Sequence, residues 1–467
     1  MAAASPSLFR VELGATLRLS APLALANLLQ MAVYALDVIF VARLGPQALA
    51  ASSLAVAIFS LINFAFIGVT GAVAPLIAAE LGRRSHAVRE VRRSVRMALW
   101  LAVLGGIGGM VLCQFGEPFM RLTGQDPVAS RIAGRFLAVL SLALIPLIVS
   151  HVLRTFVSTM GRPAFATLVT ALAIAVNALG NWALIFGHLG MPALGLTGSA
   201  LSTLLTALAT AAAYALAIHG DRRLRRCHIF GHWWRGEWQR LREIVRLGVP
   251  IALTVVAEGG LFSSAAFLMG RIGETQLAAH AVALQVAAFF FQVPFGVGQA
   301  ATIRVGYHYG AGDAAAVGRA GWAALAVGFA FVGVSASAML LIPRLILSAY
   351  VEVGSPANAL LIAFAVQYLA VAAAFQLVDG AQTVAAGALR GLQDTHVPMV
   401  IAIAGYWLPG FGTAVLLGLA TPLAGVGVWI GLAVGLTVVA IALVWRWHRR
   451  GPLGLLPAPR IFCAEPA

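Results

Sequence analysis

The sequence contains no lysine, and charged residues of either sign are few. Asp, Glu, Lys and Arg make up 10% of the 467 residues, and all 31 basic residues are arginine. Soluble domains usually have about 25% charged residues, so a water-soluble protein is excluded. The missing lysine also excludes a P-loop lysine, a pyridoxal Schiff base and a Ser-x-x-Lys nucleophile, and with them a conventional ATP-hydrolysing subunit.

Cysteine is scarce as well. Cys113, Cys227 and Cys463 are scattered along the chain, which is typical neither of a disulfide framework nor of a zinc site. The sequence shows neither a Cys/His metal set nor a Ser-His-Asp order. We therefore expect no catalytic residues, no enzymatic activity and no resident cofactor.

Apolar residues, in contrast, are abundant. They make up 61% of the chain, and the mean hydropathy is +0.93. Runs this long predict helices, because an α-helix satisfies its backbone hydrogen bonds within one segment of the bilayer. The sequence therefore predicts an all-α integral membrane protein with twelve transmembrane helices. We place them at about 16–42, 50–79, 96–115, 131–157, 164–186, 192–219, 246–270, 278–304, 319–346, 356–389, 397–418 and 424–447.

The arginines are distributed unequally between the two sides of the membrane. With these spans, 25 of the 31 lie on the side of the two termini. The positive-inside rule then predicts that both termini are cytoplasmic. The net charge of +15 reflects this orientation, so we expect no nucleic-acid partner.

The first span carries Tyr34 and Asp37 and is too polar for a cleaved signal peptide, so it is expected to be retained.

An internal repeat divides the chain. Residues 42–51 (ARLGPQALAA) resemble residues 270–279 (GRIGETQLAA), at an offset of 228 positions. An even number of helices per repeat makes the halves parallel, so they are expected to be related by a pseudo-two-fold axis along the membrane normal, a recurrent plan among transporters. The predicted parts are an N-terminal tail (1–15), an N-lobe (16–219), a linker (220–245), a C-lobe (246–447) and a C-terminal tail (448–467).

The linker combines arginine with tryptophan. Its residues Trp234, Trp238, Leu241 and Val245 recur at helical spacing. This pattern predicts an amphipathic helix at the cytoplasmic surface that joins the two lobes.

Three acidic residues fall well inside predicted spans: Asp37, Glu258 and Asp379. A carboxylate at the bilayer centre costs about 2.5–3.5 kcal/mol or more, which is lowered if the group holds a proton or a cation. We therefore expect these acids to have a function. Polar residues at helical spacing accompany them, and the candidate site residues among these are Tyr34, Asn177, Asn181, Gln285 and Gln382. For the stripe of glutamines that contains Gln285, packing between helices remains an equal alternative.

Several segments resemble one family of transporters. They are 277–285 (LAAHAVALQ), 301–310 (ATIRVGYHYG), 375–398 (FQLVDGAQTVAAGALRGLQDTHVP) and 177–187 (NALGNWALIFG). These runs are similar to the eighth, tenth and fifth helices of the multidrug and toxic compound extrusion (MATE) transporters, and the NorM-like branch fits best. The resemblance covers about residues 15–450.

The resemblance implies a two-lobed antiporter that exports cationic or amphiphilic drugs in exchange for H⁺ or Na⁺. Cation-binding acids of the family correspond to Asp37, Glu258 and Asp379, so a Na⁺ ion is implied at the last two. Phe375 stands where NorM-like members often have tyrosine, and the lost hydroxyl favours proton coupling. The expected location is the bacterial inner membrane, and a monomer is expected. The alternative is a lipid-linked oligosaccharide flippase of the related superfamily, for which intramembrane arginines would be needed.

Overall fold

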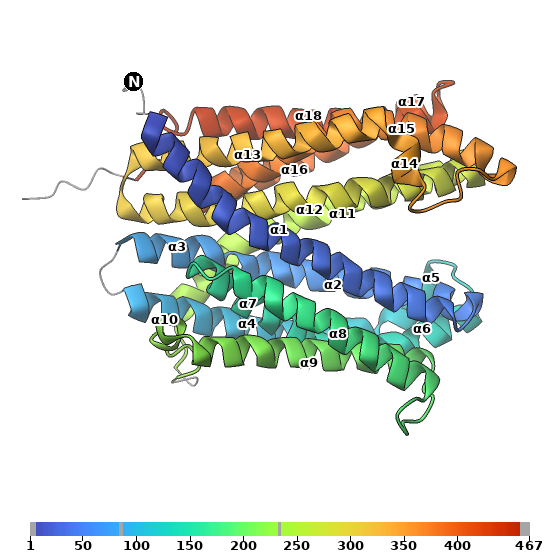
Figure 1. The fold of residues 1–467 in the computed structure, drawn as a ribbon, viewed down its shortest axis with the longest axis horizontal. Helices are drawn as coiled ribbons and strands as arrows, with labels where there is room; N and C mark the ends of the chain where they lie inside the picture. The colour runs from blue at the N-terminus through green and yellow to red at the C-terminus, as the bar shows by residue number, and fades with distance from the viewer. Residues whose placement is uncertain (1–5, 84–86, 232–234, 458–467) are drawn as a thin grey trace, which may run out of the picture. The chain divides into compact units, whose positions relative to one another are not determined.

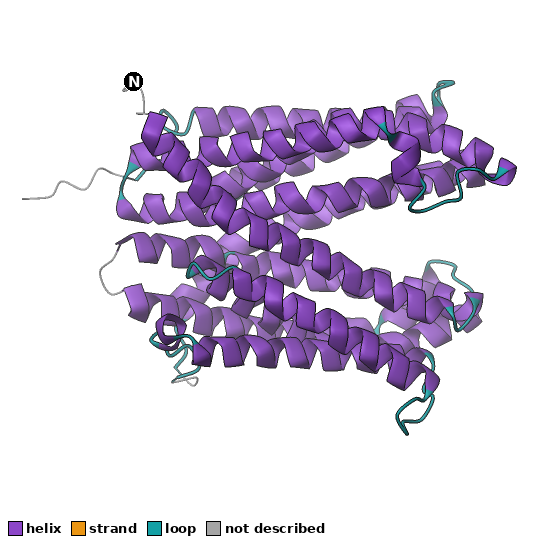
Figure 2. Cartoon of the chain, in the orientation of Figure 1, coloured by secondary structure: helices purple, strands orange, loops and turns teal. Residues whose placement is uncertain are grey.

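The computed structural model describes the chain except for residues 1–5, 84–86, 232–234 and 458–467. All regular structure in the described part is helical, with loops and turns between the helices (Figure 2). Twelve helical segments of this part are long and apolar enough to cross a membrane. The all-α fold and the number of spans predicted from the sequence are therefore confirmed.

The helices lie close to the predicted spans, and most extend beyond them by a few residues. In chain order they are α1 (Pro6–Ala42), α2 (Pro46–Gly71), α3 (Val73–Arg83), α4 (Ala87–Gln114), α5 (Gly116–Leu122), α6 (Pro127–Leu140), η1 (Ser141–Ala143), α7 (Leu144–Thr159), α8 (Ala164–Phe186), α9 (Leu196–Gly220), α10 (Arg222–Arg225), α11 (Trp238–Ile272), α12 (Glu274–Ala311), α13 (Ala314–Leu341), α14 (Pro343–Leu347), η2 (Pro356–Asn358), α15 (Ala359–Gly391), α16 (His396–Gly405), η3 (Tyr406–Phe411), α17 (Gly412–Leu419) and α18 (Ala424–His448).

One span is interrupted by a wider turn. The eleventh candidate span, His396–Leu419, consists of α16, the π-helical turn η3 and α17. Pro409 lies inside this turn and has no N–H for the helical ladder. Turns of this kind often occur at functional sites, and η3 begins with the buried side chain of Tyr406.

The chain forms two compact units whose residues are not consecutive. Unit 1 comprises Met1–Ala24, Ala78–Arg84 and Thr254–Ala467, and unit 2 comprises Leu25–Ile77 and Ser85–Leu253. The short helix α3 changes unit after Ile77, and two long helices also belong to both units, because α1 changes unit after Ala24 and α11 after Leu253. Each contains a proline shortly before the change, Pro22 in α1 and Pro250 in α11. The lobe boundaries given by the repeat stay a prediction.

In unit 1, α15 is the central helix. It packs against α12, α13 and α18, which run alongside it (Figure 1). The approach of α12 and α15 is close at Gly298 and Gly387, where the Thr302 hydroxyl of α12 donates a hydrogen bond to the Gly387 carbonyl at 2.8 Å. Large aromatic side chains, among them Trp429 and Tyr368, fill the core around α15.

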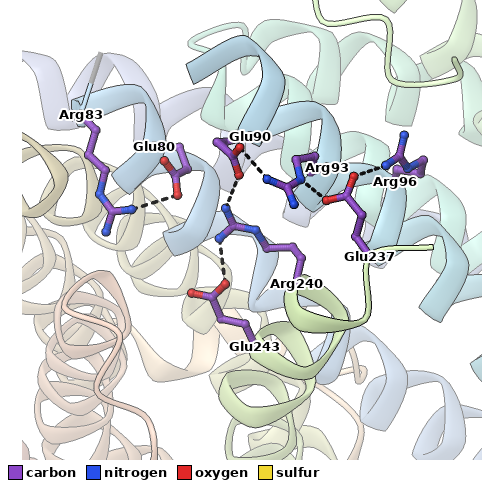
Figure 3. Close-up of polar contacts among 8 residues, drawn as sticks. All are labelled: Glu80, Arg83, Glu90, Arg93, Arg96, Glu237, Arg240 and Glu243. Atoms are coloured by element: carbon purple, nitrogen blue, oxygen red, sulfur yellow. Dashed lines mark hydrogen bonds and ion pairs between the residues drawn. The ribbon is translucent and has the colours of Figure 1, made fainter. Parts of the chain in front are cut away.

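In unit 2, an ion-pair cluster holds the beginning of α11 against α4 (Figure 3). Arg93 and Arg96 of α4 both pair with Glu237, the residue before α11. Arg240, in the first turn of α11, pairs with Glu90 of α4 at 2.7 Å. The first part of α11 is therefore fixed to the unit that contains α4.

The linker differs from its prediction. It contains the single-turn helix α10, and Trp238, Leu241 and Val245 lie in the first turns of α11 rather than in a separate amphipathic helix. The ion pairs with α4 fix the first turns of α11, and the helix continues from them into the seventh span. Gly248 and Pro250, which often end helices, lie within α11. Trp234 lies outside the described residues.

Candidate functional site

In unit 2, α1 and α8 bring one acid and two amides together. The Nδ2 atoms of Asn177 and Asn181 donate hydrogen bonds to the same oxygen of Asp37, Oδ1, at 2.9 and 2.8 Å. Asn181 Nδ2 also lies 3.1 Å from Asn177 Oδ1. The two asparagines share one face of α8 because they are four residues apart, and both are fully buried. The sequence-predicted residues Asp37, Asn177 and Asn181 thus form one hydrogen-bonded group.

Helix α9 fixes the backbone beside this group. The Ser202 hydroxyl donates to the backbone carbonyl of Asn177 at 3.1 Å, and Ser202 is fully buried. Within the described residues, Asn181 Oδ1 is buried without a hydrogen-bond partner. An acceptor oxygen is therefore available next to the Asp37 carboxylate.

Two other polar residues of α1 are placed differently. Tyr34, three residues before Asp37, has 48% of its surface exposed within the described chain. Asn27 is buried and accepts a hydrogen bond from Arg154 Nη2 of α7 at 2.5 Å. Of these polar residues of α1, only Asp37 joins the asparagines of α8.

In unit 1, a single glutamine connects the other two predicted acids. Gln382 Nε2 lies 3.2 Å from Oε1 of Glu258 and 3.1 Å from Oδ1 of Asp379, and it donates to both carboxylates. Glu258 comes from α11, whereas Asp379 and Gln382 lie one turn apart on α15. Asp379 and Gln382 are 3% exposed, so the carboxyl group of Asp379 is located deep among apolar helices.

Tyr406 is a member of this group that the sequence analysis missed. Its hydroxyl donates to Gln382 Oε1 at 2.9 Å, and the side chain is buried at the beginning of the π-helical turn η3. The sequence signal was a tyrosine three residues before Pro409 within an apolar span. This spacing alone does not indicate a helix irregularity that turns a side chain inward.

Phe375 and Gln285 lie outside the hydrogen-bonded group. Phe375 is buried one turn before Asp379, and its ring packs edge-on against Phe262 and Trp429 at centroid distances of 6.0 and 5.8 Å. Gln285 is exposed on α12. A hydroxyl does reach the hydrogen-bonded group, but it is that of Tyr406, which comes from another helix.

The chemistry of both groups is that of oxygen ligands and proton acceptors. Among the residues that the structure describes, no group of three or more His, Cys, Asp or Glu side chains is placed to hold a metal ion. Hard cations take oxygen ligands, so a Na⁺ ion at Glu258 and Asp379 would need further oxygens, such as those of Gln382 and Tyr406. A proton needs only one of the carboxylates.

The two repeats also match one family model. The model described as MatE matches residues 22–183 and 250–416, which are more than half of the chain. The chain belongs to the MatE family. The two matches begin 228 residues apart, the same offset as the internal repeat of the sequence. This agrees with a MatE chain built from two copies of one unit.

Curated relatives align along nearly the entire MatE chain. A probable multidrug resistance protein NorM of Mesorhizobium japonicum is 44% identical over 449 residues, which cover 96% of each chain. The multidrug resistance protein NorM of Burkholderia vietnamiensis is 38% identical over 460 residues, which cover 98% of each. The predicted NorM-like resemblance is confirmed.

Solved structures show the same fold at lower identity. A eukaryotic MATE transporter superimposes with a TM-score of 0.85 at 19% identity, covering 94% of this chain and 96% of the other. A multidrug resistance MATE family transporter in an outward-facing conformation gives a TM-score of 0.84 at 21% identity, covering 97% and 99%. The chain is therefore a multi-pass membrane protein with a MATE transporter fold.

Proposed function

We propose that the protein is a multidrug efflux transporter that exports organic cations by antiport with H⁺ or Na⁺. The observation that carries the proposal is the pair of hydrogen-bonded carboxylate groups inside the apolar helices of a MatE chain. A buried carboxylate is costly unless it is protonated or holds a cation. Its free energy therefore changes when a proton or cation binds, and this change can drive a conformational transition.

Each group has a distinct role in the proposal. Asp379 and Glu258 alternate between a charged form and a form that is protonated or bound to Na⁺, and Gln382 remains hydrogen-bonded to both. Asp37, with Asn177 and Asn181, forms a second site for the same ion. Drug and ion need not share a site, provided that both bind with different affinity to the two states of the transporter. We further propose an inner-membrane location with both termini cytoplasmic, from the arginine distribution, and a monomeric state.

Transport from proteoliposomes tests this function. The full-length chain is reconstituted, and efflux of a fluorescent organic cation is followed under an imposed pH gradient or an imposed Na⁺ gradient, each varied separately. We expect one of the two gradients to drive efflux, and the Asp379→Asn and Glu258→Gln double variant to abolish it. A matched control is Glu352→Gln, which changes an exposed acid in the α14–α15 connection.

The outcomes separate the parts of the proposal. Efflux that neither gradient drives would exclude antiport with these ions. Gradient-driven efflux that persists in the double variant would exclude the coupling role of Asp379 and Glu258 and leave the transport function intact. Loss of efflux in Glu352→Gln as well would show that the assay responds to any change of charge.

A further inference from the structure

Beyond the transport sites, unit 2 has a small cavity at one end of α9. It has a volume of about 280 Å³, and its lining includes His219, Arg225, His228 and Phe230. His219 lies in the last turn of α9, which is one of the candidate membrane spans, and the other three lie in the segment that follows. The cavity is therefore located at the end of a span, at the depth where the phosphate groups of membrane lipids lie.

The polar groups of the cavity are available for a ligand. The His219 ring donates from Nδ1 to the Ala215 carbonyl at 2.8 Å, which leaves its Nε2 for another partner. The Phe230 ring is stacked on His219 at a centroid distance of 5.5 Å and an interplanar angle of 8°. His228 has a left-handed backbone with φ of 45°, a conformation that non-glycine residues rarely adopt and that often occurs where ligands are clamped.

The surroundings are strongly basic. Four exposed arginines occur within five residues, and none of their guanidinium groups forms an ion pair with an acidic side chain in the described part of the chain. The one acid of this segment, Asp221, already pairs with Arg162 at 3.1 Å. The four are Arg222, Arg223, Arg225 and Arg226.

Buried side chains and a hydrogen bond from α4 anchor the segment that follows α9. Leu224, Cys227 and Ile229 are buried, and Arg92 of α4 donates from Nε to the Cys227 carbonyl at 2.7 Å. Since these buried residues lie on both sides of Arg225 and His228, the backbone of the two exposed residues is anchored at the cavity. A fixed, cationic, partly aromatic cavity differs from a merely basic loop, which would satisfy the positive-inside rule without a preformed site.

We propose that this cavity binds the phosphodiester headgroup of an anionic phospholipid. Guanidinium and imidazole groups recognise phosphate oxygens through charge-assisted hydrogen bonds, and basic clusters directly after a membrane helix attract anionic lipids. Two exposed apolar side chains, Leu216 one turn before His219 on α9 and Phe230 in the cavity lining, provide apolar surface for the glycerol and acyl parts of such a lipid. A soluble phosphate would make no use of them.

Native mass spectrometry of the full-length chain in detergent micelles tests the proposal, because micelles without added lipid have no anionic surface. Phosphatidylglycerol and phosphatidylcholine are titrated separately. We expect preferential retention of phosphatidylglycerol, and Arg225→Gln should weaken it about tenfold, the loss of roughly one charge-assisted hydrogen bond. His219→Gln is a second variant, also expected to weaken retention. Arg242→Gln on α11 removes the same charge from another exposed arginine of unit 2 and should change retention less than about twofold.

Each result decides between the occupants. Equal retention of the two lipids, or equal effects of Arg225→Gln and Arg242→Gln, would overturn the site. Displacement of phosphatidylglycerol by inorganic phosphate or glycerol 3-phosphate at similar concentrations would show a soluble phosphate site instead. A melting temperature unchanged in Arg225→Gln, expected for an exposed side chain, would show that weaker retention reflects the site rather than unfolding.

Discussion

At the scale of single residues, the two carboxylate groups differ in how their hydrogen-bond donors are used. Asp37 receives two amide groups on one oxygen. Glu258 and Asp379, in contrast, share the single amide nitrogen of Gln382. That nitrogen has only two hydrogens, so both are committed when both acids are bonded. The orientation of Gln382 then depends on its oxygen, which accepts from Tyr406.

Tyr406→Phe removes this orienting hydrogen bond and keeps the ring. A buried hydrogen bond contributes about 0.5–1.5 kcal/mol, so we expect gradient-driven efflux to fall about threefold to tenfold while the fold is retained. The measurement is efflux from proteoliposomes at several values of pH or Na⁺ concentration. Tyr350→Phe, at an exposed tyrosine between α14 and η2, is the matched control. An unchanged dependence of efflux on the coupling ion in Tyr406→Phe would contradict the orienting role.

The sequence predicts the members of these groups where helical spacing brings them together. Asn177 and Asn181 are one turn apart, and so are Asp379 and Gln382, so their shared faces follow from the chain alone. Tyr406 lies on another helix, and only the tertiary packing of η3 brings it to Gln382. The glutamine stripe that contains Gln285 does not determine which way that side chain faces, and Gln285 is exposed on α12. The functional roles of all these residues stay predictions.

At the scale of elements, the contact between α12 and α15 requires a residue without a side chain. A Cβ atom added at Gly387 would lie 2.3 Å from the backbone oxygen of Gly298. Backbone atoms cannot yield as a flexible side chain can, so the two helices would have to separate. Since α15 carries Asp379 and Gln382, this spacing also fixes the position of the acid group.

Gly387→Ala should therefore destabilise the protein. Overpacking of a well-packed core costs about 1–3 kcal/mol, which would lower the melting temperature of the purified protein in detergent. Gly333→Ala on α13 is the control, because nothing lies within 4 Å of its added Cβ. That change should be neutral or slightly stabilising, since alanine is the better helix former. Equal melting temperatures of the two variants would contradict the close approach.

A second prediction at this scale concerns the cap of α10. Partial burial acts to raise the pKa of Asp221. Hydrogen bonds from the backbone N–H groups of Arg223 and Leu224, together with the charges of Arg162 and Arg223, outweigh it, so the pKa lies below its ordinary value. A carboxyl with a lowered pKa stabilises the folded state above its unfolded pKa, and this contribution is lost as the pH falls through the folded pKa.

Asp221→Ala should thus cost about 1 kcal/mol at neutral pH, the usual effect of losing a helix cap. The difference in melting temperature from the wild type should shrink as the pH falls below about 4. Asp221→Asn retains a capping oxygen and has no titrating group, so its cost at neutral pH should be smaller than that of alanine. A cost of Asp221→Ala that is the same at pH 7 and at pH 3 would contradict the contribution of the charge.

The elements themselves could be predicted well because their apolar runs are long. The beginnings and ends could not, because ion pairs and caps that join distant segments extend the helices. The start of α11 is one example, since Glu237 and Arg240 reach α4 and make Trp238 the first residue of a long helix. The π-helical turn η3 is another, because Pro409 in a sequence does not reveal which type of turn will accommodate it.

At the scale of the whole molecule, the start of α1 belongs to unit 1 together with residues far along the chain. Glu12 is 7% exposed, and its carboxylate accepts hydrogen bonds from Arg304 Nη2 at 2.6 Å and pairs with His308 Nε2 at 2.8 Å. Arg304 and His308 are one turn apart on α12. A single carboxylate thus ties the first helix to the C-terminal part of the chain.

Glu12→Gln should weaken this tie. A hydrogen bond to a charged group contributes about 1.5–3 kcal/mol, and the variant leaves the Arg304 charge without its counter-ion, so we expect a lower melting temperature. Glu117→Gln removes an acid from the more exposed pair with Arg121 and should cost less than about 1 kcal/mol. If both variants melted at the same temperature, Glu12 would have no structural role in unit 1.

The sequence predicts the number of repeats at this scale but not the composition of the units. The offset of 228 follows from matching residues and agrees with the two family matches. The repeat alone suggests that each half packs within itself. In the structure, the first parts of α1 and α11 belong to a different unit from the rest of each helix. This division depends on tertiary contacts such as those of Glu12 and Glu237, which no local sequence pattern contains.

The division of α1 between the two units also determines the order in which contacts can form during synthesis on the ribosome. Unit 2 ends at Leu253, so all of its residues have been synthesised when little more than half of the chain exists. Unit 1 contains the beginning of α1 and also α18. Glu12 is therefore synthesised nearly three hundred residues before Arg304 and His308, so these ion pairs cannot form until α12 has been made.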